Sequence, residues 1–130
     1  SNTDRSYLFG RLLAVAEQVE RATYDREEKR ESNAIRMQAV FAQRPLYAWR
    51  IIEEKLIPYY ARLAPGLRAY FKNLVGDILD KLPDPGDPAL AQRLEDVYLL
   101  GYYQQRTALT RKKDTTVTEE KNDEYAEQQD

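Results

Sequence analysis

Residues 8–22 read LFGRLLAVAEQVERA, and the spacing of their apolar positions decides the class of fold. The apolar residues that repeat in steps of four and three are Leu8, Leu12, Val15, Val19 and Ala22. Side chains at this spacing lie on one side of an α-helix. The pattern predicts a long amphipathic helix over about residues 4–30, with Thr3 or Asp4 as its N-terminal cap. Its last part, residues 25–31, is almost entirely charged and is expected to project into solvent.

Proline and glycine residues divide the remaining sequence into further helical segments. Pro45 and Pro65 suit the first turns of helices, whereas Pro58 should kink or split the helix that contains it. Residues 83–88, PDPGDP, cannot continue a helix, so Asp87 is expected to cap the next one. The five predicted helices cover about residues 4–30, 33–42, 44–63, 65–82 and 88–113.

These segments predict an all-α protein with a single helical bundle over residues 1–113. A chain of 130 residues fits one domain, and no strand-like alternation of apolar and polar residues occurs. Residues 114–130 contain seven acidic residues, one lysine and almost no apolar side chains, so they predict a disordered acidic tail. The tail has a net charge of −6, which leaves +4 on residues 1–113 although the whole chain has −2.

Composition argues against the common kinds of catalysis. The chain has no Cys and no His, which excludes disulfides, thiolate or imidazole metal ligands and an imidazole general base. Neighbouring carboxylates such as Glu53 and Glu54 point about 100° apart on a helix and do not form a catalytic pair. We therefore expect no enzymatic activity and no cofactor. No apolar run is long enough to span a membrane and no signal peptide is evident, so a cytoplasmic location is expected.

Two predicted helices carry stripes of basic residues. In the fifth helix, the residues at relative positions i, i+4, i+7 and i+11 are Tyr102, Arg106, Leu109 and Lys113. In the third helix, Arg44, Lys55 and Arg62 align on the side opposite the apolar face. Such stripes suit a phosphate backbone, with an adjacent aromatic ring available for stacking on bases. The helix dipole also favours cations near a helix C-terminus, so a purely structural explanation of the basic residues stays open.

The residues selected as candidate contacts to nucleic acid are Arg44, Lys55, Arg62, Tyr102, Arg106, Arg111, Lys112 and Lys113. Tyr102 is the one tyrosine of ten that we select for stacking, because it shares a helical face with Arg106. The other selected residues are expected to contact phosphates. Arginine predominates among the bases of residues 1–113, and its planar guanidinium suits forked phosphate contacts.

Two blocks of sequence resemble a known family. Residues 100–106, LGYYQQR, resemble the LGYYHQR signature near the end of the large-subunit family of type I-C CRISPR Cascade complexes. Residues 7–17, YLFGRLLAVAE, resemble that family's YLLGRLFAVLE block, which lies upstream of the signature. Gln104 stands where the family usually has His, so any role of that imidazole does not carry over.

The resemblance implies a function in antiviral defence. In this family the C-terminal region is also made separately as a small subunit, and the length of this chain is similar to it. The resemblance implies a non-catalytic subunit, present in more than one copy, beside the backbone and large subunits. It would stabilise crRNA-guided target DNA without sequence preference, in particular the displaced strand of the R-loop. The alternative is a structural helical adaptor that bridges protein subunits without contacting nucleic acid.

Overall fold

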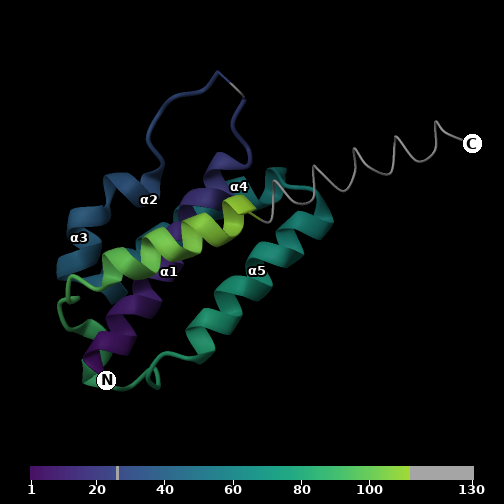
Figure 1. The fold of residues 1–130 in the computed structure, drawn as a ribbon. Coiled ribbons are helices and arrows are strands. Elements are labelled where there is room, and N and C mark those ends of the chain that lie inside the picture. Colours follow the sequence, from purple (N-terminus) through teal and green to yellow (C-terminus); the bar gives the residue numbers. More distant parts are fainter. Residues whose placement is uncertain (26, 112–130) are drawn as a thin grey trace, which may run out of the picture.

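The computed structural model describes residues 1–25 and 27–111, and all regular secondary structure in these residues is helical. The elements are α1 (Asn2–Arg21), α2 (Asn33–Arg36), α3 (Gln38–Gln43), α4 (Pro45–Arg62), α5 (Pro65–Asp80), a 3-10 helix η1 (Pro88–Ala91) and a helical segment over residues 98–111 (Figure 1). The all-α prediction is confirmed. The predicted acidic tail, residues 114–130, and the predicted end of the bundle at residue 113 lie outside the described residues.

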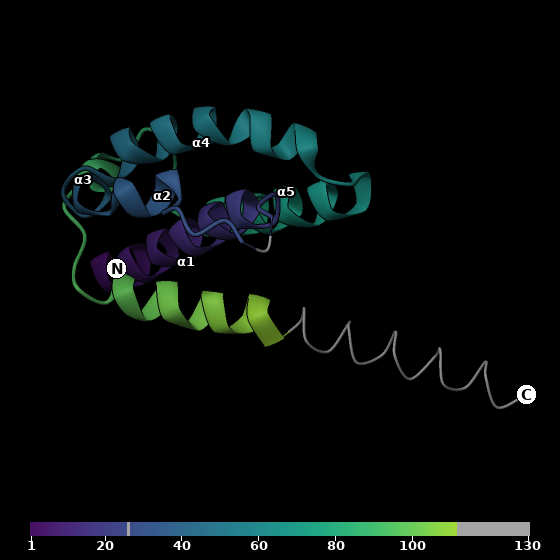
Figure 2. The ribbon, with the colours of Figure 1, turned by 90° about the horizontal axis from the view of Figure 1, so that it is seen from above.

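Helix α1 is the centre of the fold. Figure 2 shows α1 between α4 on one side and the helical segment 98–111 on the other. Because neighbours pack on both sides, the core residues of α1 are not confined to one stripe. The side chains on α1 that are at most 1% exposed include Phe9, Leu12, Leu13, Val15, Ala16 and Val19. They pack with residues of other elements such as Phe41, Ile52, Leu56 and Ile78.

Two glycines let α1 and the segment 98–111 approach closely. A Cβ atom on Gly10 would lie 1.8 Å from the carbonyl oxygen of Tyr98, and one on Gly101 would lie 2.1 Å from the carbonyl oxygen of Tyr7. Each glycine therefore admits the backbone of the other helix where any side chain would collide with it. The two helices run in the same direction along this contact (Figure 2). The two sequence blocks that carry the family resemblance are thus packed against each other.

The first helix is shorter than the sequence predicts. Helix α1 ends at Arg21, and residues 22–25 and 27–32 connect it to α2. A helix in a protein is stabilised mainly by packing of an apolar face, and the charged residues 27–31 provide none. The cap also differs from the prediction, since the Ser1 hydroxyl accepts a hydrogen bond from the Asp4 N–H at 3.2 Å. The predicted helix over 33–42 divides at Met37 into α2 and α3.

Helix α4 does not split at Pro58, one of the two outcomes predicted there, and the predicted start of the fifth helix is wrong. Helix α4 continues through Pro58, which is exposed, so the carbonyl that loses its N–H partner can bond to water. Asp87 caps only the short helix η1, by accepting from the Ala89 N–H at 2.9 Å. The next residues are not helical, and the Leu94 N–H donates to the Ala42 carbonyl and the Glu95 N–H to the Ser6 hydroxyl. Helical structure resumes at residue 98.

Candidate nucleic-acid interface

Of the three cations selected on the predicted third helix, Lys55 and Arg62 lie on the surface of α4, and Arg44 is the residue just before its first turn. Arg44, Lys55 and Arg62 are all exposed, and none forms an ion pair with a residue that the structure describes. Their spacing of 11 and 7 residues places them within about 20° of one another around the helix axis. Arg50 is a fourth exposed cation on α4, and it too has no ion-pair partner among the described residues. The sequence argument missed Arg50 because it lies off the alignment.

Tyrosine rings accompany the cations at both ends of α4. The Arg44 guanidinium lies 4.1 Å from the centre of the Tyr47 ring, and the Arg62 guanidinium lies 5.2 Å from the Tyr59 ring. Both distances are within the range of cation–π contacts. Tyr47 is 48% exposed, whereas Tyr59 is only 9% exposed. Tyr47 is therefore the tyrosine on α4 that combines a stacked guanidinium with an accessible ring.

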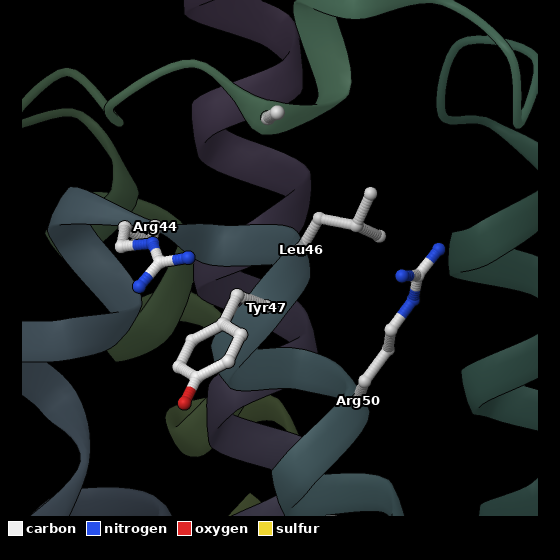
Figure 3. A pocket seen from close by; sticks show the side chains of 5 residues that line it. Arg44, Leu46, Tyr47 and Arg50 are labelled. Carbon is white, nitrogen blue, oxygen red and sulfur yellow. The ribbon is translucent and has the colours of Figure 1, made fainter.

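A shallow hollow lies at the start of α4. It is lined by Arg44, Leu46, Tyr47, Arg50 and Ala91 and has a volume of about 250 Å³. Figure 3 shows Arg44 and Arg50 on opposite sides of this hollow, with Leu46 and Tyr47 between them. Ala91 comes from η1, so the hollow exists because η1 packs beside α4. No local pattern predicts this contact, which joins residues more than 40 positions apart.

Residues 25 and 27–31 are exposed, as predicted, but Arg30 also folds back onto the C-terminal end of α4. Its guanidinium lies 4.8 Å from the centre of the Tyr24 ring and donates to the Tyr59 hydroxyl at 3.0 Å. It also pairs with Glu28 at 3.8 Å. Arg30 and Arg62 consequently share the Tyr59 ring as a neighbour. This brings a further cation to the surface of α4 that helical spacing could not assign.

The selection of Tyr102 as an exposed stacking residue is wrong. Its side chain is 6% exposed, and its hydroxyl donates a hydrogen bond to Glu17 Oε2 at 2.7 Å. Burial, with the bond to the Glu17 carboxylate, raises the pKa of Tyr102 well above its usual value. Glu17 comes from α1, so Tyr102 faces the helix on which its own segment packs. A base could reach this ring only if the two helices separated.

Arg106 is partly engaged by the same carboxylate. Its Nε atom lies 3.9 Å from Glu17 Oε1, while its side chain remains 47% exposed and that of Glu17 only 4%. Glu17 Oε1 accepts no hydrogen bond among the described residues, so the ion pair with Arg106 is the interaction that offsets the charge of this buried oxygen. One role of Arg106 is therefore to balance a buried charge. Arg111 is exposed at the end of the described chain, and Lys112 and Lys113 lie outside the described residues.

Polar contacts between the same two helices extend this packing. The Tyr7 hydroxyl donates to Gln104 Oε1, and the Arg11 Nε donates to Gln105 Oε1 at 2.8 Å. The residue in place of the family's usual His, Gln104, is thus a partner of α1. We use the term interhelical clasp for the contacts of Tyr7, Gly10, Arg11 and Glu17 with Tyr98, Gly101, Tyr102, Gln104, Gln105 and Arg106.

The two predicted basic stripes do not share a face. Figure 2 shows α4 and the segment 98–111 on opposite sides of α1. Among residues 1–25 and 27–111, the two sets of cations therefore do not line a single continuous groove. The segment 98–111 instead exposes apolar surface, since Leu100 is 51% and Tyr103 57% exposed.

In residues 1–25 and 27–111, no three carboxylates lie close enough together to hold a metal ion. Within the same residues, no helix has the length and apolar character needed to cross a membrane.

The fold and the α4 surface define a small all-helical domain with a basic, tyrosine-bearing outer helix. The chain belongs to the CRISPR-associated protein family Cas_Csd1, whose family model matches residues 1–110. No protein of curated function matches the chain significantly. The match confirms the family resemblance carried by residues 7–17 and 100–106, and it is consistent with a component of a Cascade-type complex.

Proposed function

We propose that this chain is a non-enzymatic small subunit of a type I-C Cascade complex that helps to hold the target DNA. The subunit would be present in more than one copy, beside the backbone and large subunits, in the cytoplasm. Its ligand would be the crRNA-guided target, in particular the displaced single strand of the R-loop. Membership of the CRISPR-associated family supports the proposal that the chain is a component of a CRISPR complex. The surface of α4 supports the contact to DNA.

The observation that carries the proposal is the set of unpaired cations on α4. Arg44, Lys55 and Arg62 are exposed and have no carboxylate partner among the described residues. Phosphates can therefore bind them without first displacing an intramolecular ion pair. Three such contacts would give weak binding with a log–log salt slope of about −2, taking roughly −0.7 per phosphate of a single strand.

Weak, sequence-independent binding suits the proposed role. Guide pairing supplies the sequence specificity of an RNA-guided complex, so the protein needs only to hold the backbone of the displaced strand. Several copies along one complex would add their contacts through a high effective concentration, without any single tight site. A helix that carries exposed cations along its length meets this requirement.

The test compares two triple variants with equal loss of charge. The first is Arg44→Ala, Lys55→Ala and Arg62→Ala on α4. The control is Arg21→Ala, Arg36→Ala and Lys81→Ala, which removes three exposed cations from other elements. Single-stranded DNA binding by each variant would be titrated at several salt concentrations, with a melting curve to verify folding.

We expect the α4 variant to lose about two units of salt slope, while the control keeps most of it. An equal loss in both variants would mean that DNA responds only to net charge, and the α4 assignment would fail. In assembled complexes the α4 variant should incorporate normally but form R-loops less efficiently. If the unaltered chain binds no DNA, alone or in the complex, the proposal itself fails.

A second candidate function, the structural adaptor, is favoured by the exposed apolar residues of the segment 98–111. Leu100 and Tyr103 are three residues apart on one helical face, and both are more than half exposed. Aromatic and apolar side chains of this kind are typical of protein interfaces. A pull-down of the complex with Leu100→Ser and Tyr103→Ser would test it. Loss of incorporation with DNA binding intact would assign this face to a protein partner.

A further inference from the structure

We propose that the hollow at the start of α4 is a seat for one unpaired nucleotide. The base would lie against Tyr47, Leu46 and Ala91, and the phosphates on its two sides would contact Arg44 and Arg50. This inference rests on the proposed function and deepens it, because it names a residue-level site and the part of the DNA that occupies it. Four of its five residues lie outside the set selected from the sequence.

The shape of the hollow suits a single flat group. Its volume of about 250 Å³ is below the 300–1,000 Å³ typical of pockets that enclose small molecules. The floor is formed by the Leu46 and Ala91 side chains and the Tyr47 ring, which present apolar surface. A base can cover such a floor with one face while its edge and sugar remain in solvent. An enclosed metabolite would need deeper walls than these residues provide.

The charges at the rim suit a phosphodiester backbone. Arg44 and Arg50 lie on opposite sides of the floor, as Figure 3 shows, so a chain that crosses the hollow would meet a cation on each side. No acidic residue lines the hollow, and the first turn of α4 contains none. Glu54 follows Arg50 at the four-residue spacing of a helical ion pair, yet no such pair is formed. Both guanidinium groups are thus available to an anion.

The stacked pair of Arg44 and Tyr47 favours a nucleic acid over an acidic peptide. The guanidinium lies 4.1 Å from the ring centre, and nearly half of the tyrosine surface is still exposed. Bases stack on tyrosine rings and on guanidinium planes, and such stacking tolerates any sequence. A carboxylate would use the charge of this pair but gain little from the ring. The hollow also lies on the same helix as Lys55 and Arg62, so a bound strand could continue along α4.

The experiment separates recognition of the base from recognition of the backbone. The full chain would be titrated, by fluorescence anisotropy, with a labelled thymidine oligonucleotide and with an abasic oligonucleotide of equal length and charge. The variants are Tyr47→Ala, the ring-retaining Tyr47→Phe and the matched control Tyr103→Ala. Tyr103 is similarly exposed but lies on the helical segment at the other side of α1. A melting curve for each variant would verify that it is folded.

We expect Tyr47→Ala to weaken binding of the thymidine oligonucleotide about fivefold, at the lower end of the range for one stacked base. Its binding of the abasic oligonucleotide should stay within twofold of the unaltered chain. Tyr47→Phe and Tyr103→Ala should leave both affinities unchanged. Arg44→Ala combined with Arg50→Ala should reduce the salt slope by about 1.4 for both oligonucleotides, the value for two phosphates.

Three outcomes would contradict the proposal that the hollow is a seat for a nucleotide. An equal effect of Tyr47→Ala on both oligonucleotides would mean that the ring does not recognise a base. Displacement of DNA by poly-glutamate with the same dependence on Tyr47 would assign the hollow to acidic peptides. DNA binding that depends on Lys55 and Arg62 but is indifferent to Tyr47 would remove the seat and leave the proposed function standing. Absence of DNA binding by the unaltered chain would remove both.

Discussion

Replacing Gly10 by alanine should destabilise this protein far more than the addition of one methyl group suggests. The new Cβ atom would lie 1.8 Å from the Tyr98 carbonyl oxygen, 2.7 Å from the Tyr98 carbonyl carbon and 3.0 Å from the Tyr102 nitrogen. All three atoms belong to the backbone of the segment 98–111, so no side chain can rotate out of the way. The two helices would have to separate for the variant to fold.

The distance by which the two helices must separate sets the size of the expected loss in stability. Ordinary van der Waals contact begins at 3.4 Å, so the carbonyl oxygen of Tyr98 must move by about 1.6 Å. A radial gap of even 0.5–1 Å forfeits roughly a quarter to a half of a dispersion contact. Overpacking in cores typically costs about 1–3 kcal/mol, and an obstruction by backbone belongs at the upper end or beyond. We expect a loss of about 3 kcal/mol or more, a large share of the roughly 5–15 kcal/mol that stabilises a domain.

The assay is a thermal melt followed by circular dichroism, with Gly76→Ala as the matched control. Gly76 lies inside α5, and a Cβ atom there would meet nothing within 4 Å. Alanine should therefore stabilise that helix by about 0.5–1 kcal/mol. At roughly 4 °C per kcal/mol, Gly10→Ala should lower the midpoint by about 12 °C, while Gly76→Ala raises it slightly. A Gly10→Ala midpoint equal to that of the unaltered protein would refute the close helix contact.

Three further variants or conditions test the packing around α1. Tyr102→Phe should cost about 1.5–3 kcal/mol, because it removes the hydrogen bond to the buried Glu17 carboxylate, and adding Glu17→Gln should recover part of that loss in urea unfolding. Leu94→Ala removes a side chain that is 5% exposed and should cost about 2–5 kcal/mol in the same assay. Burial raises the pKa of Tyr60 to about 12, and burial together with the Glu17 carboxylate raises that of Tyr102 further. The stabilisation that these two tyrosines contribute should hence be fully present below about pH 10, the tyrosine pKa in the unfolded chain. The free energy of unfolding should fall as the pH rises above that value, and it should fall less steeply in Tyr102→Phe.

The class of fold and the interior breaks could be predicted from the sequence because they depend on local chemistry. Pro45 and Pro65 begin α4 and α5, as their fixed backbone angle and missing N–H require. The start of the last helix depends on distant partners instead. Residues 94 and 95 lie outside any helix, and Ala42 and Ser6 accept hydrogen bonds from their N–H groups. No local pattern reveals such a partner.

The candidate site divides in the same way. Helical periodicity alone selected Arg44, Lys55 and Arg62, and all three are exposed in the structure. The same reasoning failed for Tyr102, since a shared face with Arg106 does not tell whether that face meets solvent or another helix. Here it meets Glu17, which is 85 residues away in the sequence. The hollow beside Tyr47 was missed because Ala91 of η1 completes it.

The position of the interhelical clasp changes where the function should be sought. The two blocks that resemble the family hold α1 and the segment 98–111 together, through Gly10, Gly101 and the bond from Tyr102 to Glu17. Their residues are thus accounted for by the fold, whereas the unpaired cations of α4 are not. Variants in the clasp should therefore lower DNA binding only in proportion to the folded fraction. Variants at Arg44, Tyr47 or Lys55 should lower it while the melting curve stays unchanged, and that contrast separates a structural signature from a binding surface.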